Sequence, residues 1–184
     1  MGNPAALAIG PGILLINPTL ASSEPVDLSG GAGGWPAGWA QLGYTESGTL
    51  MGIETTFEDV EVAEELDPVA ILATKRMITV GFSLAEITAT NLKRVFNGGS
   101  ITAASGAVLF DPPALGSEVY VMLGWESTAV DERWIFRKVI QTTKVEIPRQ
   151  KAPAKALLPV EFRAVVPAGG LKPYRAIMAS PGRA

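Results

Sequence analysis

The strongest constraint on this chain is its alternation of short apolar runs with glycine and proline. Its 184 residues include 20 Gly and 14 Pro, and these two residue types repeatedly interrupt the apolar runs. Both weaken the interior of a regular element, so elements between them stay short. Short strands at this spacing are typical of an all-β sandwich or barrel. Strand-like runs occupy residues 12–17, 48–57, 75–82, 107–110, 118–125, 133–141, 145–147, 160–166 and 174–178.

The longest pair of these runs predicts a β-hairpin over about residues 48–82. Residues 48–57 alternate with a period of two, and residues 75–82 return with β-branched Ile78, Thr79 and Val80. The connection over 58–74 is far longer than the roughly 2–5 residues of an ordinary hairpin loop. We therefore expect an extended loop there.

A different pattern predicts one amphipathic helix over about residues 84–97. Ser83 and Glu86 match a capping box, in which each side chain accepts from a free backbone N–H at the start of a helix. Gly98 and Gly99 supply a left-handed cap at its end. Apolar residues then recur near helical spacing, at Leu84, Ile87, Leu92, Val95 and Phe96.

Length and composition favour one domain over residues 1–184. Hydrophobic residues make up 47% of the chain and charged residues 18%, which is enough to build a buried core. Residues 21–38 are rich in Gly, Ser and Pro and predict a flexible loop, and we also expect flexible termini. The apolar stretch at residues 5–16 is interrupted by Gly and Pro and follows no basic residue, so we expect no signal peptide.

The missing residue types argue against catalysis. Without Cys there can be no disulfide framework, zinc–thiolate site or thiol nucleophile, and without His the commonest general base is lost. The cluster at Gly30–Gly34 lacks the Gly-Lys-Ser/Thr ending of a phosphate loop. We predict no enzymatic activity, no cofactor and no metal site.

Charge is distributed unevenly along the chain. Residues 1–132 hold 4 Lys/Arg and 16 Asp/Glu, a net charge of −12, whereas residues 133–184 hold 11 and 2, a net charge of +9; together they give the overall −3. Such complementary halves can pair within one chain or between neighbouring copies. The basic segment is also a competing candidate for a nucleic-acid patch, although a pI of about 5.1 argues against it.

Six carboxylates crowd the predicted loop without a single basic residue among them. They lack the ligand alternation and the glycine of a calcium-binding loop. Either they form a stacking loop that meets basic residues of an adjacent subunit, or they are a solvated surface. The acids are Glu58, Asp59, Glu61, Glu64, Glu65 and Asp67, and the candidate basic partners are Arg133, Arg137, Lys138 and Lys144.

The four tryptophans divide into two pairs. Trp125 and Trp134 lie in predicted strands and are expected in the core. Trp35 and Trp39 lie in the glycine-rich segment and are candidates for a subunit interface, where large rigid side chains often act as anchors.

Five segments resemble, in the same order, the tail tube (major tail) proteins of long-tailed bacteriophages, especially those of actinobacterial hosts. They are PGILLINP (11–18, first strand), GWAQLGYT (38–45, entry to the long hairpin), EELDPV (64–69, its tip), SLAEITATNLKRVFNGG (83–99, helix) and LPVEFRAV (158–165, late strand). The resemblance spans about residues 10–180.

This resemblance implies a β-sandwich or barrel with a flanking helix, in which six copies form a ring and rings stack into a hollow tube in the virion tail. It also implies assembly in the host cytoplasm and partners in the tape measure, tail terminator and tail-tip proteins. DNA would pass through the lumen without specific binding, as an acidic or neutral wall favours. The alternatives are a related minor tail or tail terminator protein, or a sandwich-type binding module.

Overall fold

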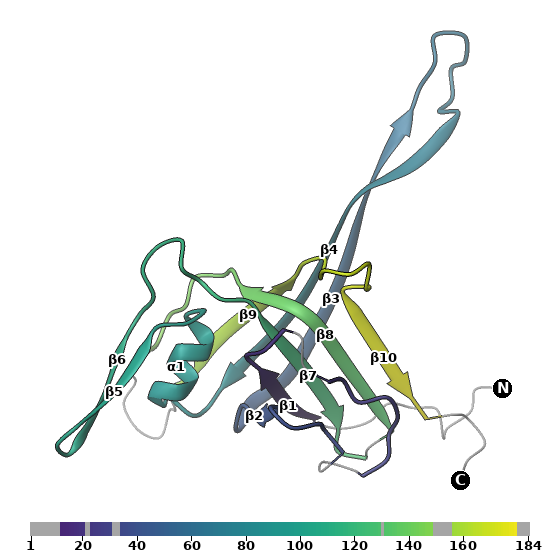
Figure 1. The fold of residues 1–184 in the computed structure, drawn as a ribbon. Helices are drawn as coiled ribbons and strands as arrows, with labels where there is room; N and C mark the ends of the chain where they lie inside the picture. The colour runs from purple at the N-terminus through teal and green to yellow at the C-terminus, as the bar shows by residue number, and fades with distance from the viewer. Residues whose placement is uncertain (1–11, 21–22, 31–33, 130, 149–155, 180–184) are drawn as a thin grey trace.

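The structure, a computed structural model, describes residues 12–20, 23–30, 34–129, 131–148 and 156–179 and is mainly β. Its elements are β1 (Gly12–Asn17), β2 (Ala40–Gln41), β3 (Thr45–Val60), β4 (Ala70–Leu84), α1 (Ala89–Val95), β5 (Ser100–Ala104), β6 (Ala107–Asp111), β7 (Val121–Ser127), β8 (Glu132–Gln141), β9 (Leu158–Ala164) and β10 (Tyr174–Met178). The predicted fold class, mainly β with a single helix among the described residues, is confirmed (Figure 1). The flexible termini that we expected lie outside the described residues.

Eight strands form one antiparallel sheet. Its hydrogen-bonded order is β2-β1-β7-β8-β9-β4-β3, and β10 pairs with the first half of β8 while β9 pairs with its end. The two ends of this path, β2 and β3, are joined by only residues 42–44. The sheet therefore curls around one core as an incompletely closed barrel, and β5 and β6 form a separate hairpin.

The core lies inside the curled sheet and follows the period of two. On β4, Ile78, Val80, Phe82 and Leu84 are buried while the residues between them are not. They face the alternate residues of β9, and the rings of Phe82 and Phe162 stack with centroids 5.9 Å apart. Each such side chain contributes about 1.5–3 kcal/mol when fully buried.

The helix begins later than predicted. Ser83 and Leu84 belong to β4 and pair with β9, so the predicted capping box does not form. The cap is instead Thr88, whose Oγ1 accepts from the backbone N–H of Asn91 at 3.1 Å. Leu84 is fully buried as the last inward residue of β4, and this burial outweighs the local helical signal.

The helix ends at a left-handed residue, but that residue is Asn97 and not one of the glycines we expected. Asn97 has φ of 57°, and the next N–H, that of Gly98, donates to the carbonyl of Lys93 at 2.8 Å, a Schellman arrangement. The Asn97 side chain also exchanges two hydrogen bonds with the backbone of Gln141 at 2.8 and 2.9 Å. It thereby fixes the helix end to β8.

The sequence pattern also missed two strands and predicted one that does not form. The missed strands are β2 and β5, and the strand that does not form is the one predicted at 145–147. Val145 and Ile147 are half-buried and pack against the core, which explains their apolar character without a strand partner. Sequence periodicity cannot distinguish packing of this kind from a paired strand.

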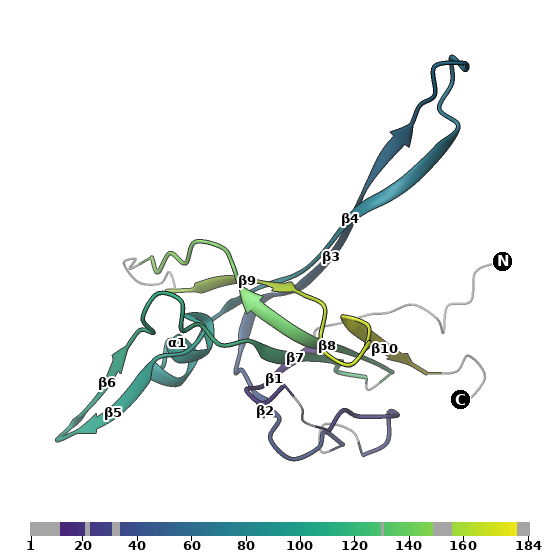
Figure 2. The same ribbon diagram turned by 45° about the horizontal axis from the view of Figure 1, so that its top comes forward.

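The predicted hairpin is longer, and its loop shorter, than the sequence indicated. β3 and β4 stay paired out to Val60 and Ala70, so only residues 61–69 connect them instead of 58–74. The two strands form a ribbon that projects far from the curled sheet (Figure 2). We call the projecting part, residues 53–76, the arm.

Candidate functional site: the projecting arm and its surroundings

The exposure of the β4 side chains changes where the arm leaves the curled sheet. Along β4, every residue from Ala70 to Arg76 is exposed, whereas alternate residues from Ile78 onward are buried. A bulge in the pairing with β3 falls at the same level, between Thr56 and Phe57. A two-stranded ribbon alone in water is marginally stable at best. The outer arm therefore gains from contact with another surface.

The arm and the residues beside it expose many apolar side chains. Leu50 is 77% exposed, Ile71 66% and Phe57 60%, and the tip residue Leu66 is fully exposed. Further exposed apolar residues are Ile53, Val62, Val69 and Leu72. Exposed apolar side chains in this number on one projecting element are typical of an interaction surface. The arm is thus the strongest candidate for an assembly surface.

The six predicted acids all lie at the outer end of this arm and are exposed. Glu58 and Asp59 are in β3, and Glu61, Glu64, Glu65 and Asp67 are in the connecting residues 61–69. Among the described residues, none of the six forms an ion pair with a basic side chain. The tip therefore presents apolar and acidic groups together.

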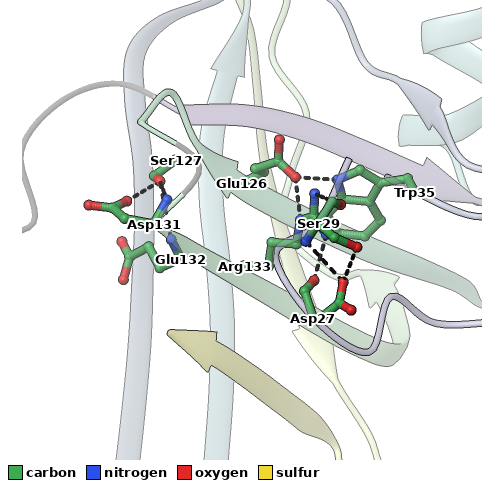
Figure 3. A network of polar contacts seen from close by, with 8 residues as sticks. All are labelled: Asp27, Ser29, Trp35, Glu126, Ser127, Asp131, Glu132 and Arg133. Carbon is green, nitrogen blue, oxygen red and sulfur yellow. Dashed lines mark hydrogen bonds and ion pairs between the residues drawn. The ribbon is translucent and has the colours of Figure 1, made fainter. Parts of the chain in front are cut away.

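Arg133 was a candidate partner for those acids, and that assignment is wrong. Its side chain is fully buried, and its Nε donates to Glu126 Oε2 at 2.5 Å (Figure 3). Its terminal nitrogens donate to the carbonyls of Asp27 at 2.6 Å and Ser29 at 3.4 Å. Arg133 therefore joins β7 and β8 to the segment that we had expected to be a flexible loop.

Trp35 belongs to the same buried network. Its indole N–H donates to Glu126 Oε2 at 2.7 Å, and its ring lies 5.7 Å from the Arg133 guanidinium. The ring also packs on Gly124, where an added Cβ would lie 2.4 Å from it. Glu126 Oε1 is buried without a hydrogen-bond partner among the described residues. The network closes around one carboxylate and holds Asp27, Ser29 and Trp35 on the sheet.

Trp39 contacts its own chain in the same way. It packs against Trp35 with centroids 4.7 Å apart, and its N–H donates to the Ser23 carbonyl at 3.0 Å. Trp125 and Trp134 lie in β7 and β8 and pack against the core, as predicted. Trp35 and Trp39 thus contact groups of their own chain, and their proposed interface role has no support from these contacts.

The other basic candidates also have partners of their own. Arg137 is buried and pairs with Glu24, its Nε and a terminal nitrogen lying 2.5 and 2.9 Å from the two carboxylate oxygens. Lys138 lies over the ring of Tyr120 at 4.4 Å. Lys144 is exposed and pairs with Glu146 two residues away. Arg137 is therefore unavailable to a neighbouring acid, whereas Lys138 and Lys144 remain near the surface.

Within the described ranges, no group of three or more His, Cys, Asp or Glu side chains is placed to hold a metal ion. No helix in the described part of the chain has the length and apolar character needed to cross a membrane.

A family model described as "Phage tail tube protein" matches residues 3–181, nearly the whole chain. The chain belongs to the phage tail tube protein family. No curated protein matches it. Its membership implies a structural component of the virion tail and not an enzyme.

The tail tube protein carries features that the sequence did not reveal. Nothing in the pattern around Glu24 indicated that it would hold Arg137 and, at 3.4 Å, Arg175. Glu126 left a faint signal, since it is the only charged residue of the otherwise largely apolar β7. A charge on an inward position of a strand indicates a buried partner, but not which one.

Proposed function

We propose that this tail tube protein forms hexameric rings that stack head to tail into a hollow tube, through which DNA passes into the host. The observation that carries the proposal is the arm, which projects from the body (Figure 1) and exposes apolar and acidic side chains. Within the described part of the chain, none of its six acids pairs with a basic side chain. An arm of this kind reaches from one copy to the next. Head-to-tail contacts close within a ring and extend from ring to ring.

The charge of the chain supports a conduit. A net charge of −3 and a pI of about 5.1 disfavour strong binding to phosphates, which depends on neutralisation by Lys and Arg. DNA can then move along the wall without being held. The tube encloses the tape measure protein during assembly and ends on tail terminator and tail-tip proteins, and assembly takes place in the host cytoplasm.

Electron microscopy of the purified chain at rising concentration tests the proposal. We expect ring views and striated tubes, with six copies per ring by native mass spectrometry. Rings that never stack, even with tail initiators present, would favour the tail terminator alternative. A monomer at every concentration, with initiators present, would refute the proposal.

A variant with a shortened arm tests directly whether the arm joins the rings. Glu58 and Leu72 are directly opposite in the pairing, so residues 59–71 can be replaced by Asn-Gly, which favours a two-residue hairpin turn. The replaced residues are exposed or half-buried and contribute little to the core, so the body should stay folded in thermal melting. Stacked tubes should be lost.

A further inference from the structure

A groove at the root of the arm is lined by basic and apolar side chains. It has a volume of about 800 Å³ and lies between the arm, the end of β9 and the loop before β10. Its cations are Lys75, Arg76, Arg163 and Lys172, and its exposed apolar residues include Val166 and Leu171. Its lining, as far as the structure describes the chain, includes no Asp or Glu. We call this surface the root groove.

Among the described residues, the four cations of the root groove form no ion pair with an acidic side chain. All 18 Asp and Glu residues lie within the described ranges, and none of them forms an ion pair with these four side chains there. Lys75, Arg76 and Lys172 are exposed and Arg163 is half-buried. Four like charges around one groove repel one another, so an acidic occupant would relieve that repulsion.

The tip of the arm has the complementary composition. Its six carboxylates share this short segment with Val62, Leu66 and Val69, which are exposed apolar residues. Acids would meet the cations of the root groove, while Leu66 and its neighbours would meet Val166 and Leu171. Matching of both charge and apolar surface is what distinguishes a specific contact from general attraction.

A chain's own tip cannot reach its own root groove. Six residues of continuous strand separate Arg76 from Ala70, a span of about 20 Å at roughly 3.3 Å per residue. The strands stay paired over that length, so the ribbon cannot fold back on itself. The occupant must come from another copy.

We propose that the tip of one copy's arm, residues 58–69, docks in the root groove of another copy. This proposal rests on the proposed function and identifies the two surfaces that join successive subunits. In this proposal the partners of the acidic tip are the accessible cations of the root groove, and no longer Arg133 and Arg137, which are buried. The contact is both apolar and electrostatic, so salt should weaken it without abolishing it.

Charge reversal separates the two proposals. The Lys75→Glu/Lys172→Glu double variant should raise the protein concentration needed for tubes at least about tenfold, as should Glu61→Lys/Glu64→Lys at the tip. Combining all four substitutions restores opposite charges across the contact and should recover tubes. The control Lys93→Glu, matched to the single variant Lys75→Glu, reverses one exposed lysine outside the groove and should leave assembly unchanged.

The absence of cysteine allows a direct test of position. Oxidation of the Leu66→Cys/Leu171→Cys variant should link chains into oligomers, with the linking peptide identified by mass spectrometry. The control pair Leu66→Cys/Leu115→Cys places the second thiol on a fully exposed residue outside the groove and should not link. Equal linking in both variants, or none in the first, would overturn the proposal.

Each outcome distinguishes the docking contact from the tube itself. If the Lys75→Glu/Lys172→Glu variant forms normal tubes at the same protein concentration as the wild type, the docking contact is refuted and the proposed function still stands. If that variant forms normal tubes but binds less DNA than the wild type, the groove cations bind DNA, and the docking contact is refuted as well. Wild-type protein that forms neither tubes nor cross-links would refute both proposals.

Discussion

Replacing Arg133 with Met should be among the most destabilising single changes in this protein. It leaves Glu126, which is 1% exposed, as a buried carboxylate whose remaining donor is the N–H of Trp35. Breaking a buried ion pair from one side typically costs about 3–5 kcal/mol. The change also removes the two hydrogen bonds that hold the Asp27 and Ser29 carbonyls.

This free energy converts into a measurable shift in melting temperature. At about 2.1 cal/mol/K per residue, 184 residues give an unfolding entropy of roughly 0.39 kcal/mol/K. A loss of about 3–5 kcal/mol then lowers Tm by roughly 8–13 °C. Circular dichroism of the unassembled subunit measures it, and Arg76→Met, at an exposed arginine, should cost less than about 0.5 kcal/mol.

The double variant Glu126→Leu/Arg133→Met tests the reasoning more strictly. It removes both charges, so no uncompensated carboxylate remains, and it should be more stable than Arg133→Met alone. Two results would contradict this account. One is a loss below about 1 kcal/mol in Arg133→Met, and the other is a double variant whose loss equals the sum of the two single variants.

Three further changes probe other parts of the fold. Asn97→Gly keeps the left-handed backbone but removes two hydrogen bonds to β8, so urea unfolding should show a loss of about 1–3 kcal/mol. Gly124→Ala places a Cβ against the Trp35 ring and should cost about 1–3 kcal/mol, with a shift in tryptophan fluorescence; an unchanged spectrum would contradict the packing. The hydroxyl and backbone N–H of Ser29 donate to the Asp27 carboxylate and lower its pKa below 3.8. These bonds therefore stabilise the fold above pH 3.8, and that stabilisation is lost as the pH falls through the lowered pKa. NMR titration should show the Asp27 midpoint moving up in Ser29→Ala.

The sequence determined the class of fold and the location of the exposed acids. A period of two in residues 48–57 and 75–82 is a local property of the chain, and it correctly placed the two strands that carry the arm. The run of acids without basic residues required an exposed segment, because an unpaired buried carboxylate is costly. The order of short motifs also indicated the tail tube family, which the family model confirms.

Only the tertiary structure decided where each element ends and which charges meet. Ser83 and Leu84 fit a helix start locally, but burial of Leu84 beside β9 keeps them in a strand. Arg133 looked like any basic residue near the C-terminal half, yet the fold places it beside Glu126. Pairing across the sheet and burial are long-range consequences of packing, and no local pattern of residues encodes them.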